Sequence, residues 1–90
     1  MSIEVDVSSY FTTYTNNQRI IKVNGSTVGE CLNDLAKQFP TLQKVLFDKN
    51  GKLYHYFDIF INGESVYPES QSAPVKDGDK LNIVLIILGG

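Results

Sequence analysis

The amino-acid sequence predicts an α+β roll, in which one main helix packs across one mixed sheet of four or five strands. Three observations predict this class. Several short segments alternate apolar and polar residues with period two, which is typical of strands with one buried face. A single segment repeats its apolar residues at spacings of three and four, as an amphipathic helix does. A length of 90 residues is enough for one domain and not for two.

The first two strands are expected to form a hairpin. Ile3, Val5 and Val7 alternate with polar residues, which predicts a strand with one buried face. Residues 12–17 consist mostly of Thr and Asn and predict a polar turn. Residues 19–23 then predict the second strand, which ends at an Asn-Gly pair.

The main helix is expected to begin after Thr27, because the Thr27 hydroxyl can cap it and Glu30 completes a capping box three residues later. Pro40 is expected to end it, because proline disfavours the helical conformation at the residue before it. A second helical turn at residues 42–47 is expected to close the core. The apolar side of the main helix consists of Val28, Cys31, Leu32, Leu35, Ala36 and Phe39.

The second half of the chain predicts three more strands. Residues 56–61 form the first of them, and Asn62-Gly63 predicts a tight hairpin turn, because both residues tolerate positive φ. The remaining elements are, in order, a short strand at 64–66, a loop at 67–76, a turn at 77–79 and the last strand at 80–86.

The composition argues against several classes of protein. The formal net charge is −2, whereas a nucleic-acid-binding domain usually has a basic face. One cysteine and one histidine leave little material for a metal site, a disulfide or nucleophilic catalysis. The longest apolar run, Ile83 to Leu88, is far shorter than the about 20 residues of a membrane-spanning helix, and the first residues do not resemble an export signal. We therefore expect a cytoplasmic protein that is not itself an enzyme, binds no metal, and contacts neither nucleic acid nor membrane.

The sequence ends in Gly89-Gly90, directly after an expected core strand. A diglycine end is thin and has no Cβ near its carboxylate, so it can enter a narrow active site of another protein. The alternative is a frayed terminus without a function. The carboxylate has an ordinary pKa of about 3.3–3.7 and is a poor electrophile as the anion at neutral pH. Acyl chemistry at Gly90 therefore requires activation, for example as a mixed anhydride with a nucleotide phosphate.

Three segments are specific only in combination, through their order and the terminal position of the glycines. They are Phe60-Ile61-Asn62-Gly63, the stretch from Val75 to Ile83, and Gly89-Gly90. Together with the helix that opens at Thr27-Val28-Gly29-Glu30, they resemble the small sulfur-carrier family of ubiquitin-like proteins, which serves molybdopterin and thiamine biosynthesis. The stretch Gly51-Lys52-Leu53-Tyr54-His55 is similar to the carrier that donates sulfur for cysteine synthesis.

The resemblance implies a β-grasp fold, with residues 1–90 forming a single ubiquitin-like domain and a flexible tail at about residues 87–90. It implies that a ubiquitin-activating-like adenylyltransferase uses ATP to adenylate Gly90, which then becomes a thiocarboxylate. The resemblance also implies that the chain itself binds no cofactor. The sulfur acceptor would be an enzyme of the molybdopterin synthase large subunit, thiazole synthase or cysteine synthase type. Leu88 stands where tails of this family usually have a small residue or proline.

A protein-docking surface is expected on the outer face of the sheet. If the odd-numbered residues of 57–61 face the core, the alternation of the strand turns Tyr56 and Phe60 outward. The same argument turns Val84 and Ile86 outward on the last strand. A cluster of outward apolar residues that leads to the tail predicts docking, whereas isolated exposed apolar residues need no explanation.

Three other candidates have structural explanations. Cys31 lies on the apolar side of the helix, which predicts a buried, inert thiol. His55 stands between two tyrosines without a second ligand and is expected at the surface. Asp77 and Asp79 flank Gly78, and turn chemistry explains them better than a metal site does.

Two further functions remain open from the sequence. A protein modifier would be conjugated to lysines through the same Gly90, and it differs from a sulfur carrier only in the acceptor. A β-grasp interaction module would dock on other proteins without covalent chemistry. The mass of the intact protein separates the first two functions, because a thiocarboxylate and a lysine conjugate differ in mass.

Overall fold

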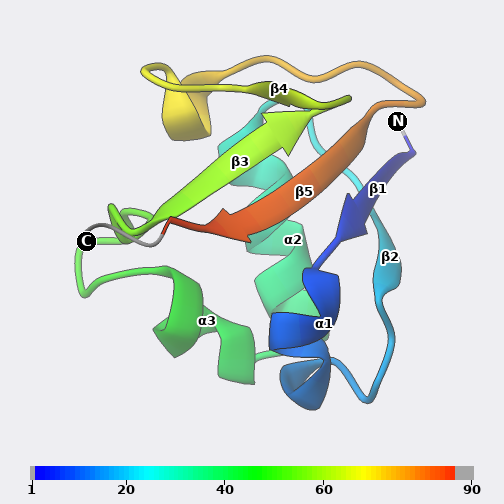
Figure 1. Ribbon diagram of the computed structural model, residues 1–90, viewed down its shortest axis with the longest axis vertical. Helices are drawn as coiled ribbons and strands as arrows, with labels where there is room; N and C mark the ends of the chain where they lie inside the picture. The colour runs from blue at the N-terminus through cyan, green and yellow to red at the C-terminus, as the bar shows by residue number, and fades with distance from the viewer. Residues whose placement is uncertain (1, 87–90) are drawn as a thin grey trace.

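The computed structural model describes residues 2–86 and contains one five-stranded mixed sheet with α2 packed across one face (Figure 1). The strand order is β2-β1-β5-β3-β4. The strands are β1 (Ile3–Asp6), β2 (Ile20–Val23), β3 (Phe57–Ile61), β4 (Glu64–Ser65) and β5 (Lys80–Leu85). The helices are α1 (Ser8–Phe11), α2 (Val28–Gln38) and α3 (Thr41–Leu46), with 3-10 turns η1 (Thr12–Tyr14) and η2 (Ser70–Ser72).

The first and last strands lie side by side in the middle of the sheet (Figure 1). β1 and β5 run parallel, with Val5 opposite Leu81, and the other neighbouring pairs are antiparallel. This confirms the predicted mixed sheet. Because β5 is flanked by β1 and β3, the segment that leads toward the C-terminus leaves from a strand that is paired on both sides.

Helix α2 begins and ends where the sequence predicts. Thr27 Oγ1 accepts a hydrogen bond from the Glu30 N–H at 3.2 Å. Glu30 Oε1 accepts one from the Ser26 N–H at 2.7 Å, so the return bond of the capping box reaches the residue before the cap. Phe39 has left the helical conformation, with φ −132° and ψ 82°, as expected for the residue before Pro40.

The core lies between α2 and the inner face of the sheet, and α3 closes one end of it. Leu32 and Leu35 are fully buried, which confirms the predicted apolar side of the helix. Phe39 and Ile61 are only partly buried and pack against the rim of the core. The other fully buried apolar residues include Ile3, Val5, Val7, Phe11, Val28, Cys31, Leu42, Leu46, Ile59 and Leu81.

The connection between β1 and β2 differs from the predicted polar turn, because α1 and η1 occupy it. Phe11 is fully buried, and its ring centroid lies 5.4 Å from that of Phe57. The Asp6 carboxylate accepts a 2.9 Å hydrogen bond from the Ser8 N–H at the start of α1. Burial of the Phe11 ring stabilises the helical turns by more than the neighbouring Thr and Asn residues favour an irregular turn, because intrinsic propensities are small.

The Asn62-Gly63 turn is confirmed, with φ of 50° at Asn62 and 89° at Gly63, as the tight hairpin requires. Asn62 also contacts β5, because its Oδ1 accepts from the Lys80 N–H at 3.0 Å and its Nδ2 donates to Asp79 Oδ1 at 2.9 Å. In the part of the chain from residue 2 to residue 86, no helix has the length and apolar character to cross a membrane.

Candidate functional site

The candidate functional site is the end of β5 and the surface around it, because this end leads toward the predicted reactive residue. Ile86 is the last residue that the structure describes, and its backbone N–H donates a 2.7 Å hydrogen bond to the carbonyl of Tyr56. Leu88, Gly89 and Gly90 lie outside the described residues. Their predicted roles stay predictions.

The four residues predicted to dock a partner lie together on the outer face of the sheet, on β3 and β5 or one residue beyond them. We call Tyr56, Phe60, Val84 and Ile86 the apolar patch. The register pairs Asp58 with Val84 and Phe60 with Asn82, which places these side chains on the face opposite the buried Phe57 and Ile59. Tyr56, Val84 and Ile86 are each 37% exposed, whereas Phe60 is half-buried. The outward orientation is therefore confirmed, and docking remains a prediction.

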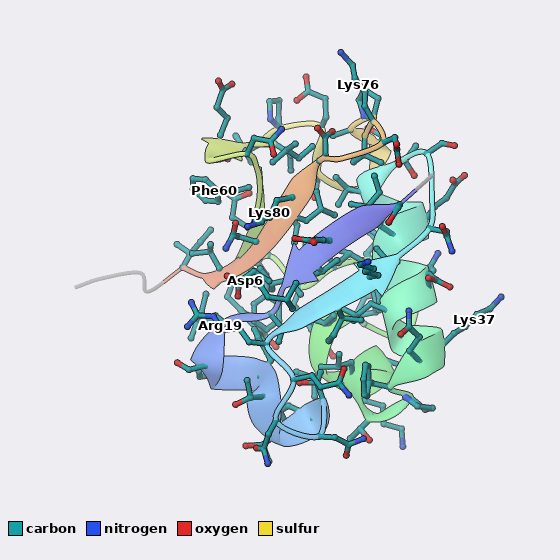
Figure 2. All side chains as sticks on the ribbon, turned by 90° about the vertical axis from the view of Figure 1, so that its right-hand side faces the viewer. Asp6, Arg19, Lys37, Phe60, Lys76 and Lys80 are labelled. Atoms are coloured by element: carbon teal, nitrogen blue, oxygen red, sulfur yellow. The ribbon has the colours of Figure 1, made fainter. Side chains whose placement is uncertain are left out.

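Polar residues surround the apolar patch on the same face. Figure 2 shows Phe60 and Lys80 on the sheet, with Asp6 and Arg19 next to each other further along it. Asp6 Oδ1 and Arg19 Nε are 2.9 Å apart. Partial burial raises the pKa of Asp6, but the Ser8 N–H and the Arg19 guanidinium together lower that pKa below its ordinary value. Asp6 is therefore a stable anion at neutral pH.

Asp58 lies within the apolar patch, between Tyr56 and Phe60 in the sequence and opposite Val84 on β5. Its Oδ1 accepts a hydrogen bond from the Ile59 N–H at 2.8 Å, and its Oδ2 accepts one from the Ser65 hydroxyl at 2.6 Å. Beyond Ser65, the Val66 N–H still donates a 3.0 Å hydrogen bond to the Ile59 carbonyl of β3, and the chain then runs toward η2. A groove opens there.

This groove has a volume of about 830 Å³ and lies between the loop before β3 and the segment that contains η2. Both sides are held together by Gln71, whose Oε1 accepts from the Leu53 N–H at 2.9 Å and whose Nε2 donates to the Gly51 carbonyl at 3.1 Å. Ile86 lines the groove as well as the apolar patch. The groove therefore reaches the end of β5.

Tyr67 is the residue of this region that the sequence prediction missed. The sequence predicts a plain loop at 67–76, yet the Tyr67 side chain is 80% exposed and lines the groove. Two features of the sequence could have indicated it. Tyr67 is an aromatic residue directly before Pro68, and the Asn62-Gly63 turn sends the chain after β4 back toward the start of β3.

The other candidates lie where the sequence predicts. Cys31 is buried, and burial raises the pKa of its thiol to about 11, with the carboxylates of Glu30 and Asp34 adding to the shift. His55 is exposed and has its ring edge toward Tyr56, at a centroid distance of 5.7 Å. Neither residue belongs to the apolar patch.

Asp77 and Asp79 organise backbone and do not converge on a ligand. Asp77 Oδ1 accepts from the Ser2 N–H at 2.6 Å, and Asp79 Oδ2 accepts from the Lys76 N–H at 2.8 Å. Over residues 2–86, no group of three or more His, Cys, Asp or Glu side chains is placed to hold a metal ion.

The order of strands and the helix across one face define a ubiquitin-like β-grasp protein. The ThiS family model matches residues 9–90, and the chain belongs to this family of ubiquitin-like sulfur carriers. The resemblance stated from the sequence is thereby confirmed.

Known proteins of this family match over nearly the whole chain. The sulfur carrier protein CysO of Mycobacterium tuberculosis is 26% identical over 93 residues that cover both chains completely. The CysO chain in the crystal structure of the Amycolatopsis orientalis BexX/CysO complex is 27% identical, with a TM-score of 0.86 and coverage of 98% of this chain and 99% of that one. SAMP1 from Haloferax volcanii is 25% identical, with a TM-score of 0.85 and full coverage of both chains.

Proposed function

We propose that the protein is a sulfur carrier whose Gly90 carboxylate is adenylated and then converted to a thiocarboxylate. The observation that carries the proposal is the position of the apolar patch, which includes Ile86, four residues before Gly90 in the sequence. A partner that binds the patch is placed where it can also receive Gly90. The similarity to sulfur carriers named CysO supports the same function.

The proposed chemistry has two steps, and a partner protein catalyses both. In the first, a Gly90 carboxylate oxygen attacks the α-phosphorus of ATP, and pyrophosphate leaves. In the second, a donor at the level of hydrosulfide attacks the acyl carbon, the C–S bond forms, and AMP leaves with the carbon–oxygen bond broken. The thioacid then loses its proton and carries the sulfur as a soft nucleophile.

In this account the chain is a protein substrate and not an enzyme. The described residues fit that role, because Cys31 is a buried thiol with a raised pKa and is unsuited to nucleophilic catalysis. The proposed partners are a ubiquitin-activating-like adenylyltransferase that uses ATP and an enzyme that accepts the sulfur. The chain itself is proposed to hold no cofactor.

A direct test is ATP–pyrophosphate exchange with the cognate activating enzyme. Wild-type protein should support exchange, whereas removal of Gly90 or addition of one residue after it should abolish exchange without changing the fold. The reason is positional, because an error of about 1 Å at the reacting atom can reduce the rate about 100-fold. Undiminished exchange by the variant without Gly90 rules the mechanism out.

Conjugation to lysines is the second candidate function, and the similarity to SAMP1, a small archaeal modifier protein, favours it. Activation of Gly90 is common to both functions. They differ in the acceptor, which is a sulfur donor for the carrier and a lysine amine for the modifier. A series of covalent conjugates of increasing mass in cell extracts would favour the modifier.

A further inference from the structure

The groove next to the apolar patch has no role in the proposed function, although the two surfaces are continuous. Ile86 belongs to both of them. Tyr56, directly before β3, connects them, because its ring stacks on that of Tyr54, which lines the groove. The ring centroids are 5.1 Å apart and the planes differ by 8°. A protein that covers the apolar patch therefore also covers the opening of the groove.

The walls of the groove are mainly aromatic and aliphatic. Leu53, Tyr54 and Phe57 line it from the β3 side, and Tyr67 and Pro68 line it from the opposite side. Tyr67 is 80% exposed, the largest exposed fraction among the large hydrophobic residues described. Exposed aromatic rings beside a groove are suited to stack on a planar group and to cover an aliphatic side chain.

The charges of the groove are predominantly negative. Asp48, Asp58 and Glu69 line it, and Lys52 is its single lysine or arginine within residues 2–86. Asp48 Oδ1 accepts the N–H groups of Asn50 and Lys52. Both oxygens of Asp58 are hydrogen-bonded.

Glu69 differs from Asp48 and Asp58, whose carboxylates accept hydrogen bonds from other parts of the chain. Its side chain makes no hydrogen bond or ion pair with residues 2–86. Glu69 also directly follows the Tyr67-Pro68 pair, so that a carboxylate and an exposed ring come from one short segment.

We propose that the groove binds an arginine side chain of the protein that activates Gly90, an inference that rests on the proposed function. A guanidinium plane stacks on Tyr67 while its N–H groups bond the carboxylate of Glu69, and the aliphatic stem packs against Leu53 and Pro68. Arginine fits better than lysine, because a planar guanidinium both stacks on rings and binds a carboxylate with two N–H groups. A purely apolar side chain would leave the carboxylates desolvated without a partner.

The test uses N-acetyl-arginine amide as the probe and follows the backbone amides of the ¹⁵N-labelled full chain by NMR. Saturable shifts should be confined to residues 52–58 and 67–72. N-acetyl-citrulline amide, which has the same shape without the charge, should bind roughly tenfold more weakly. Glu69→Gln and Tyr67→Ala should each weaken arginine binding, whereas Glu64→Gln, an exposed glutamate outside the groove, should not.

Three results would overturn the proposal. Equal affinity for the arginine and citrulline probes removes the role of the charge. Shifts confined to other surfaces place the site elsewhere. The third result concerns a variant without residues 87–90. If its groove amides already differ from those of the wild type before any probe is added, and if it binds the arginine probe more tightly, the occupant is the chain's own tail.

A second measurement uses the cognate activating enzyme. Glu69→Gln and Tyr67→Ala should each raise the KM for the carrier in pyrophosphate exchange about tenfold. Increasing salt should reduce the difference in KM between Glu69→Gln and the wild type, because salt screens the charge of Glu69. An unchanged KM for both variants would overturn the proposal. If the wild-type protein supports no exchange at all, the proposed function has failed, while the probe titration still decides whether the groove binds arginine.

Discussion

The backbone N–H of Ile86 donates a 2.7 Å hydrogen bond to the carbonyl of Tyr56, one residue beyond each of the paired strands β3 and β5. This bond extends the ladder to the last described residue. It also holds two members of the apolar patch next to each other. Ile86 is thereby held against Tyr56 at a position four residues before Gly90 in the sequence.

Ile86→Asp should weaken binding to the activating enzyme far more than it weakens the fold. A buried interface anchor contributes about 2 kcal/mol or more to binding, whereas most exposed substitutions change stability by about 0.5 kcal/mol or less. Calorimetric titration and thermal melts measure the two effects. Ile20→Asp is the control, because Ile20 is 45% exposed on the edge strand β2, which is separated from β5 by β1.

Phe60→Asp should weaken the same complex, but with a larger loss of stability, since Phe60 is half-buried. Wild-type affinity of both the Phe60 and the Ile86 variants would show that the apolar patch is not the docking site.

Leu35→Ala should lower the free energy of unfolding by roughly 2–5 kcal/mol, through lost burial and the cavity left behind. Leu35 is fully buried in the middle of α2. Chemical denaturation measures the effect, with Lys37→Ala as an exposed substitution in the same helix. An unchanged denaturation midpoint for Leu35→Ala would contradict the assigned core.

The Cys31 thiol should be unreactive toward thiol reagents in the folded protein at pH 8 and reactive after unfolding. Burial raises its pKa to about 11, from an ordinary value of 9.0. The folded protein holds the thiol proton more tightly than the unfolded chain does. The protonated thiol therefore contributes its full share of the free energy of unfolding below pH 9, and this share is lost as the pH rises toward 11. In Cys31→Ser, the free energy of unfolding should fall less steeply with pH in this window than in the wild type. Rapid labelling of the folded wild type would contradict the prediction.

Asp6→Asn should remove part of the pH dependence of stability in acid. The pKa of Asp6 is lowered in the folded state, so its contribution is present above the ordinary value of 3.8 and is lost as the pH falls below it. The effect should be about 1 kcal/mol or less, because Arg19 is largely exposed and solvent screens the pair. Denaturant unfolding at a series of pH values from neutral to acidic measures the difference from wild type.

The parts of the fold that sequence reasoning predicts are those that local chemistry determines. Thr27 and Glu30 mark the start of α2, Pro40 marks its end, and Asn62-Gly63 fixes the hairpin. The alternation on β3 and β5 likewise predicts which side chains face outward. Each of these signals acts within a few residues.

The parts that were missed depend on contacts between distant residues. Phe11 turns residues 8–14 into helical turns because its ring packs against Phe57, far away in the sequence. Gln71 joins the two sides of the groove by bonding to the backbone at Gly51 and Leu53, and no local pattern encodes that contact. Tyr67 could not be recognised as part of a surface before those segments were brought together.

The central claim, that Gly90 carries sulfur as a thiocarboxylate, is tested most directly by the mass of the intact protein. After incubation with the activating enzyme, ATP and a sulfur donor, the wild-type mass should rise by about 16 Da, as oxygen is replaced by sulfur, and the variant without Gly90 should not change. An unchanged wild-type mass under conditions that support pyrophosphate exchange, or conjugates to lysine in place of the small increase, would contradict the claim.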